Sequence, residues 1–228
     1  MTTPASNLGV FHETFWRSKP GVERTPIGAD NAELERPCPE LLHEDVNYRT
    51  MHLLAISGSL RPGSSNTAIL DAAGRLAPPG MTVERYPSVG ALPHFNPDDD
   101  SPDDGRLPTV VAEFRSRVGQ SDALLISTPE YAHGLPGAFK NALDWLVGST
   151  EFPGKPVAVI SPSARSVHAQ AQLREVLTTM SARRVERASV IVPLPSRDMD
   201  VEAIVADHEL SRLLRSVLAE IANVVRDG

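Results

Sequence analysis

Along most of the chain, short apolar runs alternate with longer segments in which apolar residues recur at helical spacing. The apolar runs predict five β-strands, at residues 52–57, 82–86, 123–127, 157–161 and 188–192. The helical spacing predicts helices at residues 66–76, 107–118, 138–147 and 167–180, with one or two more at 201–225. Two of the strands, 123–127 and 157–161, are apolar up to their final serine, as expected of strands buried on both faces of a sheet.

This alternation predicts an α/β fold in which a five-stranded parallel sheet is covered by helices on both faces. Right-handed crossovers restrict the topology, and a doubly wound sheet in the order 2-1-3-4-5 satisfies them. In such a sheet the winding direction reverses between strands 1 and 3. We therefore expect a ligand site at the carboxyl ends of these two strands.

The pattern begins only at residue 51. Residues 1–50 contain scattered prolines and mixed charges without a sustained period of 2 or 3.6, so they predict an irregular N-terminal extension. Phe11, Phe15 and Trp16 could dock a short turn of this extension, and a translation start at Met51 is the alternative. Residues 51–228 are the expected folded domain.

Composition excludes several classes of protein. The net charge of −7 argues against sequence-independent nucleic-acid binding, which needs clustered basic residues. The apolar runs are far too short to cross a membrane, and the N-terminus has no secretory-signal pattern. Cys38 is the only cysteine, which excludes an intrachain disulfide and fits a reducing cytoplasm.

The loop after the first strand combines glycine, hydroxyl side chains and one arginine just before a helix. The first backbone N–H groups of a helix are unpaired and favour anions. Ser59, Ser64 and Thr67 offer hydroxyl donors, and Arg61 offers a charge-assisted contact to phosphate. The loop lacks both GxxxxGK[ST] and GxGxxG, and it suits a terminal phosphomonoester such as that of FMN. On composition alone, an ordinary turn capped by Ser64 or Ser65 is equally consistent.

An acidic loop at residues 87–106 contains Asp98, Asp99, Asp100, Asp103 and Asp104. It lacks the spaced ligands and terminal glutamate of a calcium loop, so we interpret it as a solvated segment. We expect no metal site.

Together with the loop at residues 127–146, the first loop resembles the NADPH-dependent FMN reductase family. The family pattern GSxRxxSxN is matched at Gly58, Ser59, Arg61, Ser64 and Asn66. Its pattern PEYNxSxPGxLKNxxDW is matched at Pro129, Glu130, Tyr131, Pro136, Gly137, Lys140, Asn141, Asp144 and Trp145. The resemblance extends from Met51 to the C-terminus and does not include residues 1–50.

The resemblance implies a flavodoxin-like fold with bound FMN, NADPH as co-substrate and a small electron acceptor such as a flavin, quinone, azo or nitro compound, or metal oxyanion. It implies that Ser59, Arg61, Ser64 and Asn66 hold the FMN phosphate. It also implies that a run of six residues lines the isoalloxazine ring, namely Pro129, Glu130, Tyr131, Ala132, His133 and Gly134. A homodimer or homotetramer is implied as well. We assign no catalytic residue, because hydride transfer to a flavin needs no protein acid or base.

Two departures of the chain from what is usual in the family bear on the site. Ala132 replaces the usual asparagine and is followed by His133, for which loop packing or flavin contact is favoured over proton transfer. The loop at residues 161–166 contains Pro162 and Ala164 where the family often has glycines.

The matching residues Asn141, Asp144 and Trp145 are expected to pack and anchor a helix. Lys140 and Asp144 are expected to form a surface pair. An FMN electron carrier without nicotinamide turnover, or a non-catalytic interaction protein, are the competing hypotheses.

Overall fold

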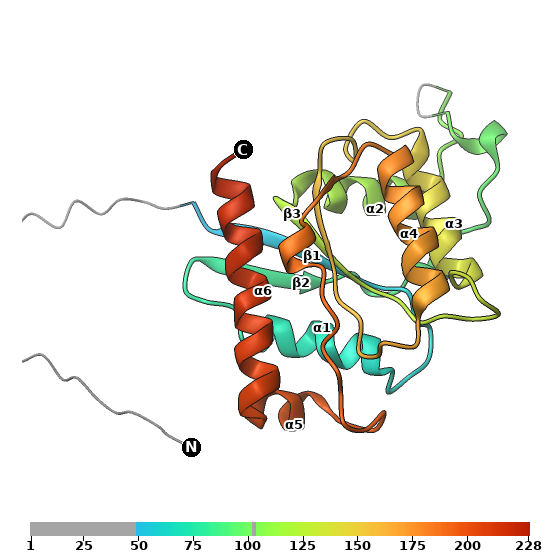
Figure 1. Ribbon diagram of the computed structural model, residues 1–228. Helices are drawn as coiled ribbons and strands as arrows, with labels where there is room; N and C mark the ends of the chain where they lie inside the picture. The colour runs from blue at the N-terminus through green and yellow to red at the C-terminus, as the bar shows by residue number, and fades with distance from the viewer. Residues whose placement is uncertain (1–48, 102–103) are drawn as a thin grey trace, which may run out of the picture. The chain divides into compact units, whose positions relative to one another are not determined.

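Five parallel strands form one sheet in the order β2-β1-β3-β4-β5, as the sequence predicts (Figure 1). The computed structural model describes residues 49–101 and 104–228. The strands are β1 (Met51–Ser57), β2 (Met81–Arg85), β3 (Ala123–Ser127), β4 (Pro156–Val159) and β5 (Arg183–Arg184). Strand β1 lies between β2 and β3, with Leu53 paired to Val83 on one side and to Ala123 on the other.

Helices follow the strands at nearly the predicted places: α1 (Ser65–Arg75), α2 (Thr109–Gln120), α3 (Gly137–Val147), α4 (Val167–Thr179), α5 (Val201–Ala206) and α6 (His208–Arg226). The described residues also include short 3-10 helices at η1 (Val89–Ala91), η2 (Pro97–Asp99) and η3 (Glu186–Ala188). The predicted last helical segment is divided at Asp207. Its carboxylate accepts a hydrogen bond from Leu210 N at 2.9 Å and so caps the start of α6.

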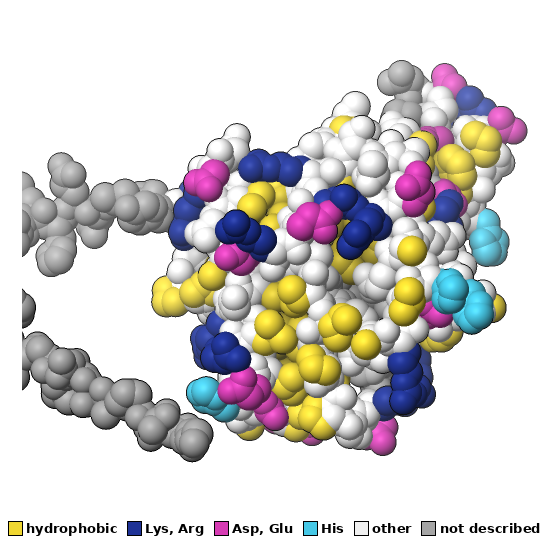
Figure 2. Space-filling view, in the orientation of Figure 1, with side chains coloured by type: hydrophobic (Ala, Val, Ile, Leu, Met, Phe, Trp, Pro, Cys, Tyr) yellow, Lys and Arg dark blue, Asp and Glu magenta, His cyan; other side chains and the backbone are white. Residues whose placement is uncertain are grey.

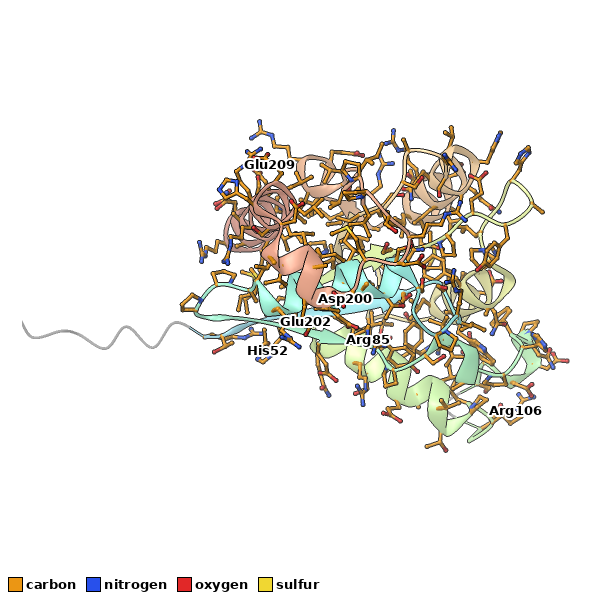
Figure 3. The ribbon with its side chains drawn as sticks, turned by 90° about the horizontal axis from the view of Figure 1, so that it is seen from below. His52, Arg85, Arg106, Asp200, Glu202 and Glu209 are labelled. Carbon is orange, nitrogen blue, oxygen red and sulfur yellow. The ribbon has the colours of Figure 1, made fainter. Side chains whose placement is uncertain are left out.

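Two apolar cores form on opposite faces of the sheet. On one face, α1, α5 and α6 pack against Leu53, Ala55 and Leu125. On the other face, α2, α3 and α4 pack against Ile56 and Leu124. Figure 3 shows this layering from below, with α5 and α6 on one side of the sheet and α2 on the other. Successive side chains of a strand point to opposite faces, which explains why β1 and β3 are almost entirely apolar up to the serine that ends each of them. Exposed His52 in β1 is the exception.

The predicted strand at residues 188–192 is wrong as a regular strand. Strand β5 is formed earlier, at Arg183–Arg184, and the chain then turns through η3. Past that turn Ser189 Oγ, instead of a backbone carbonyl, accepts the hydrogen bond from Val159 N at 3.1 Å. Ile191 then returns to the sheet through a single parallel bridge to Ser161. The fifth strand is thus interrupted by a turn that the apolar pattern of residues 188–192 does not reveal.

The acidic loop contains a buried ion pair. Arg115 on α2 is buried, and its guanidinium lies 2.8 Å from Asp100 Oδ1 and also donates from Nε to Trp145 O at 2.8 Å. The side chain of Asp100 is only 13% exposed. Describing the whole loop as solvated is therefore wrong for Asp100, which anchors the loop to the domain.

The predictions for the N-terminal extension concern residues outside the described ranges. They include those for Phe11, Phe15, Trp16 and Cys38.

Among the described helices, none is both long and apolar enough to span a bilayer.

Candidate functional site

A cavity of about 550 Å³ lies at the carboxyl ends of the strands, where the sheet topology predicts a ligand. Its volume falls within the range of about 300–1,000 Å³ that is usual for small-molecule sites. The cavity is lined by four loops, those that follow β1, β3, β4 and β5. Its lining residues are Ser59, Arg61, Ser64, Ser65, Asn66, Pro129, Glu130, Tyr131, Pro162, Ser163, Arg165, Ser166, Leu194, Pro195, Ser196 and Arg197.

The first wall of the cavity is the loop between β1 and α1. Ser64 is the N-cap of α1, and its Oγ accepts a hydrogen bond from Asn66 N at 3.2 Å. A capping hydroxyl still has its own proton to donate, so capping and phosphate binding are compatible roles for Ser64. Ser59 Oγ is in the same situation, because it accepts from Arg61 N at 3.3 Å. Within the described residues, the Arg61 side chain forms no ion pair or hydrogen bond, so its guanidinium is free to bind an anion.

The side chains of two other residues of this loop already form hydrogen bonds within the protein. Asn66 lines the cavity, but its Oδ1 accepts from Ser127 Oγ at 2.9 Å, so only its amide nitrogen remains to donate. Thr67 does not line the cavity, and its hydroxyl shares a hydrogen bond with Ser57 at 2.9 Å. The position of Thr67 favours support of the loop over contact with a phosphate.

Gly58 brings the first loop against the loop after β3. A side chain at this position would place its Cβ 2.7 Å from Thr128 Cβ and 3.0 Å from Phe139 Cγ. Gly58 N also donates to Ser127 O at 2.8 Å, which extends the pairing of β1 with β3. Glycine is therefore needed here for close approach of the two loops.

The second wall is the loop after β3, which contains a tight two-residue turn. Tyr131 and Gly134 exchange two backbone hydrogen bonds of 3.0 Å, and the two residues between them have positive φ, 48° for Ala132 and 59° for His133. Such turns favour asparagine and glycine, because other residues are strained in the left-handed region. This explains physically the asparagine that the family pattern has where this chain has Ala132.

Ala132→Asn is expected to stabilise the protein by about 1 kcal/mol, because asparagine adopts positive φ more readily than alanine. Urea unfolding followed by circular dichroism would measure the change. Ala171→Asn is the matched control, since Ala171 is an exposed residue inside α4. There asparagine is a poorer helix former and should destabilise by several tenths of a kcal/mol. Equal effects at the two positions would contradict the strained-turn interpretation.

Only the first half of this loop reaches the cavity. Pro129, Glu130 and Tyr131 line it, and the Tyr131 side chain is 55% exposed. Ala132, His133 and Gly134 are not among the lining residues. His133 instead stacks on His168, with the two ring centres 4.2 Å apart.

Helix α4 holds this loop at two points. Glu130 Oε2 accepts a hydrogen bond from Ala169 N at 2.9 Å, in the first turn of α4. Gln172 Oε1 accepts from Leu135 N at 2.8 Å. The carboxylate of Glu130 is well placed there, because the N-terminal end of a helix favours negative charge.

The remaining walls supply two arginines that the sequence analysis did not identify. Arg165 comes from the loop after β4 and Arg197 from the segment after Ile191. With Arg61 they bring three cationic side chains to a cavity that has Glu130 as its one acidic lining residue. In a chain of net charge −7, this arrangement favours an anionic ligand. The sequence could have pointed to Arg165 and Arg197, because loops that follow parallel strands all meet at one edge of the sheet.

Four family-pattern residues on α3 have the structural roles expected of them. Asn141 donates to Pro93 O at 2.8 Å and accepts from Phe95 N at 2.7 Å, while Trp145 Nε1 also donates to Pro93 O, at 2.7 Å. Lys140 and Asp144 form the expected i,i+4 ion pair. The hydrogen bonds hold α3 against the segment that contains Pro93 and Phe95. None of the residues in these contacts lines the cavity.

Comparison with known proteins identifies relatives along most of the domain. The family model described as NADPH-dependent FMN reductase matches residues 51–194. An NAD(P)H-dependent FMN reductase of Pseudomonas aeruginosa is 34% identical over 179 residues, which cover 76% of this chain and 95% of that protein. A 2-hydroxy-1,4-benzoquinone reductase of a Burkholderia species is 29% identical over 183 residues, covering 78% of this chain and 97% of that one.

A solved structure shares the fold. FerB, a flavoenzyme NAD(P)H:(acceptor) oxidoreductase from Paracoccus denitrificans, superposes with a TM-score of 0.61 at 27% identity. The match covers 78% of this chain and 98% of that chain.

Proposed function

This chain belongs to the NADPH-dependent FMN reductase family, and on that premise we propose how its cavity works. The protein is an FMN-dependent NAD(P)H oxidoreductase, in agreement with its relatives. We propose that the cavity holds FMN, with the phosphate at the start of α1 and the ring against Pro129, Glu130 and Tyr131. The observation that carries this assignment is the meeting of both family motifs at one cavity.

The residues present fit FMN. The N-terminal end of α1, the hydroxyls of Ser59 and Ser64 and the guanidinium of Arg61 form a donor set suited to a phosphate dianion. Opposite them, Pro129 and Tyr131 offer an apolar and aromatic wall for a planar ring system.

FMN bound in this cavity would supply the redox chemistry, which is two-electron transfer between NADPH and an acceptor. The protein supplies binding and orientation. The loop between β1 and α1 fixes one end of the cofactor, and the loop after β3 positions the ring plane. Two hydrogen bonds between this loop and α4 keep the loop in place, one donated by Ala169 N to Glu130 and one donated by Leu135 N to Gln172. Arg165 and Arg197 are proposed to attract the phosphate groups of the nicotinamide substrate, because both line the same cavity.

A quinone is the acceptor class that the comparisons favour, since the Burkholderia relative is named for a benzoquinone. A quinone is flat and can stack where the nicotinamide stacks. A flavin electron carrier without nicotinamide turnover is not favoured, because the relatives are named as reductases.

Mixing the anaerobic, FMN-loaded protein with NADPH tests this function. We expect rapid bleaching of the flavin absorption band, and its return when a benzoquinone is added. Repeating the experiment with NADH measures the contribution of the additional phosphate of NADPH. A protein that binds FMN but is not bleached by either nucleotide would be an electron carrier, and one that does not bind FMN would be an interaction protein.

Ping-pong kinetics are expected if the two substrates occupy the same part of the cavity in turn. Double-reciprocal plots of rate against NADPH at several fixed quinone concentrations should then be parallel. Intersecting lines would instead indicate a ternary complex and a second binding surface. Quinone should also inhibit the enzyme competitively with respect to NADPH. Such inhibition would independently indicate that the two substrates bind at the same part of the cavity.

Removal of residues 1–50 is expected to leave FMN affinity unchanged within about twofold, because the cavity is built from residues that follow β1. The deletion removes the pair of Arg49 with Asp122, but the Arg49 side chain is 78% exposed and such pairs contribute little. Fluorescence titration of both forms with FMN would measure the affinity. Loss of soluble, FMN-binding protein on deletion would contradict the proposed domain division.

We further propose a homo-oligomer located in the cytoplasm. Several large apolar side chains are exposed on the domain, including Leu60, Tyr131, Val147 and Val167. Leu60 and Tyr131 belong to the two loops beside the cavity, which supports an interface close to the flavin. Light scattering after size exclusion would report the number of subunits.

A further inference from the structure

A cluster of three potential metal ligands lies at the surface of the domain, formed by the side chains of Glu130, His133 and His168. One potential ligand atom of each lies within 4.8 Å of the others. They come from two elements, since Glu130 and His133 belong to the loop after β3 and His168 to the first turn of α4. Figure 2 shows histidine side chains gathered over the end of α4 and the neighbouring loop.

The donor set suits a divalent transition metal. Two imidazoles and one carboxylate are a recurrent zinc ligand set, which leaves a fourth coordination position open. A tetrahedral zinc ion holds its ligand atoms about 3.3 Å apart. The three ligand atoms would therefore have to move closer together, and the two stacked rings would have to rotate until a nitrogen of each points at the ion. Both histidines are exposed, which leaves them room to rotate.

The surroundings of the cluster also resemble those of a metal site. Ligating carboxylates are usually held by a further hydrogen bond, and Glu130 Oε2 already accepts from Ala169 N at 2.9 Å. That contact leaves the second carboxylate oxygen for an ion. Within the described residues, the imidazole rings of His133 and His168 form no hydrogen bond. Their ring nitrogens are therefore available.

The position of His133 depends on the strained turn. Its φ of 59° directs the loop so that its ring lies over His168. A stacked pair of exposed rings gives little stabilisation in water, and strain at a loop beside a cavity often accompanies a binding role. A ligand that joins the two rings would make use of this otherwise unfavourable turn.

We propose that Glu130, His133 and His168 form a binding site for a divalent transition metal of the zinc type. The ion links the loop after β3 to the start of α4 and leaves one position for water or an oxygen atom of a small molecule. Because Glu130 also lines the cavity, the ion sits at the cavity rim. This differs from the expectation from sequence, which found no metal site because His168 is distant along the chain from the other two ligands.

Titration of the full-length, FMN-loaded protein with Zn²⁺ in a calorimeter tests the proposal, and Co²⁺ provides a visible absorption signal for tetrahedral coordination. His168→Ala should weaken Zn²⁺ binding by about tenfold or more, and His133→Ala should do the same. The matched control is His208→Ala, an exposed histidine at the start of α6 whose side chain is 87% exposed. It should bind Zn²⁺ as the wild type does.

Thermal unfolding supplies a second readout. An ion that binds only the folded state raises the unfolding temperature, so Zn²⁺ should stabilise the wild type and His208→Ala but not His168→Ala. Equal Zn²⁺ affinity in the wild type and in both variants of the cluster would overturn the proposal, as would the absence of saturable binding below about 1 mM. None of these measurements uses NADPH, so they can fail or succeed independently of the proposed reductase activity.

Discussion

Arg61→Ala is expected to weaken FMN binding by about 10- to 150-fold. Arg61 lines the cavity beside the N-terminal end of α1, where we place the phosphate dianion. A hydrogen bond to a charged group contributes about 1.5–3 kcal/mol, and each 1.4 kcal/mol changes affinity about tenfold. Titration of the apo-protein with FMN, followed by quenching of flavin fluorescence, would measure the loss.

Riboflavin separates a phosphate contact from a general loss of the site. It lacks the phosphate, so it should bind the wild type weakly and bind Arg61→Ala equally weakly. Ser59→Ala should weaken FMN binding less than Arg61→Ala does, because it removes one uncharged donor. Arg75→Ala is the matched control, since Arg75 lies in the last turn of the same helix and is well exposed. Equal losses for FMN and riboflavin would mean that this loop does not hold the phosphate.

Asp100→Ala is expected to destabilise the domain by about 3–5 kcal/mol. The change leaves the Arg115 guanidinium buried without its carboxylate, and an uncompensated buried charge is strongly unfavourable. Urea unfolding should show a lower midpoint with an unchanged slope, because the surface exposed on unfolding stays nearly the same.

Asp98→Ala is the control from the same acidic loop. Asp98 is exposed and its side chain forms no ion pair within the described residues, so its removal should change stability by less than about 0.5 kcal/mol. In the double variant Asp100→Leu with Arg115→Met, the loss should be smaller than for Asp100→Ala, because both charges leave the interior together. Similar effects of Asp98→Ala and Asp100→Ala would show that the buried pair contributes little.

The central part of the fold could be predicted from sequence because burial on both faces leaves a simple pattern. Strand β3 was predicted at its observed bounds, Ala123–Ser127, since each of its residues is buried. The strand order followed from crossover geometry, and two of the four cavity loops followed from motifs that directly succeed β1 and β3. In each of these cases the information lies within a short stretch of sequence.

The features that could not be predicted depend on contacts between residues that are far apart in the sequence. Asp100 looks like its acidic neighbours until Arg115 is placed beside it. The apolar run at residues 188–192 predicts a strand, but Ser189 takes over a backbone hydrogen bond and η3 interrupts the pairing. Arg165 and Arg197 reach the cavity from loops without a recognisable motif, and His168 meets His133 only through the docking of α4.

The interrupted fifth strand also affects how copies of this protein can associate. Strand β5 is one edge of the sheet, and it offers only Arg183–Arg184 to a further strand. A two-residue edge with charged side chains is a poor template for pairing with another chain, and natural sheets use such edges to avoid aggregation. Continuation of the sheet from one subunit into the next is therefore disfavoured at this edge. An assembly that avoids both this edge and β2, the opposite edge of the sheet, must be built through helices and loops. Its formation would leave the strand ladder of each subunit unchanged.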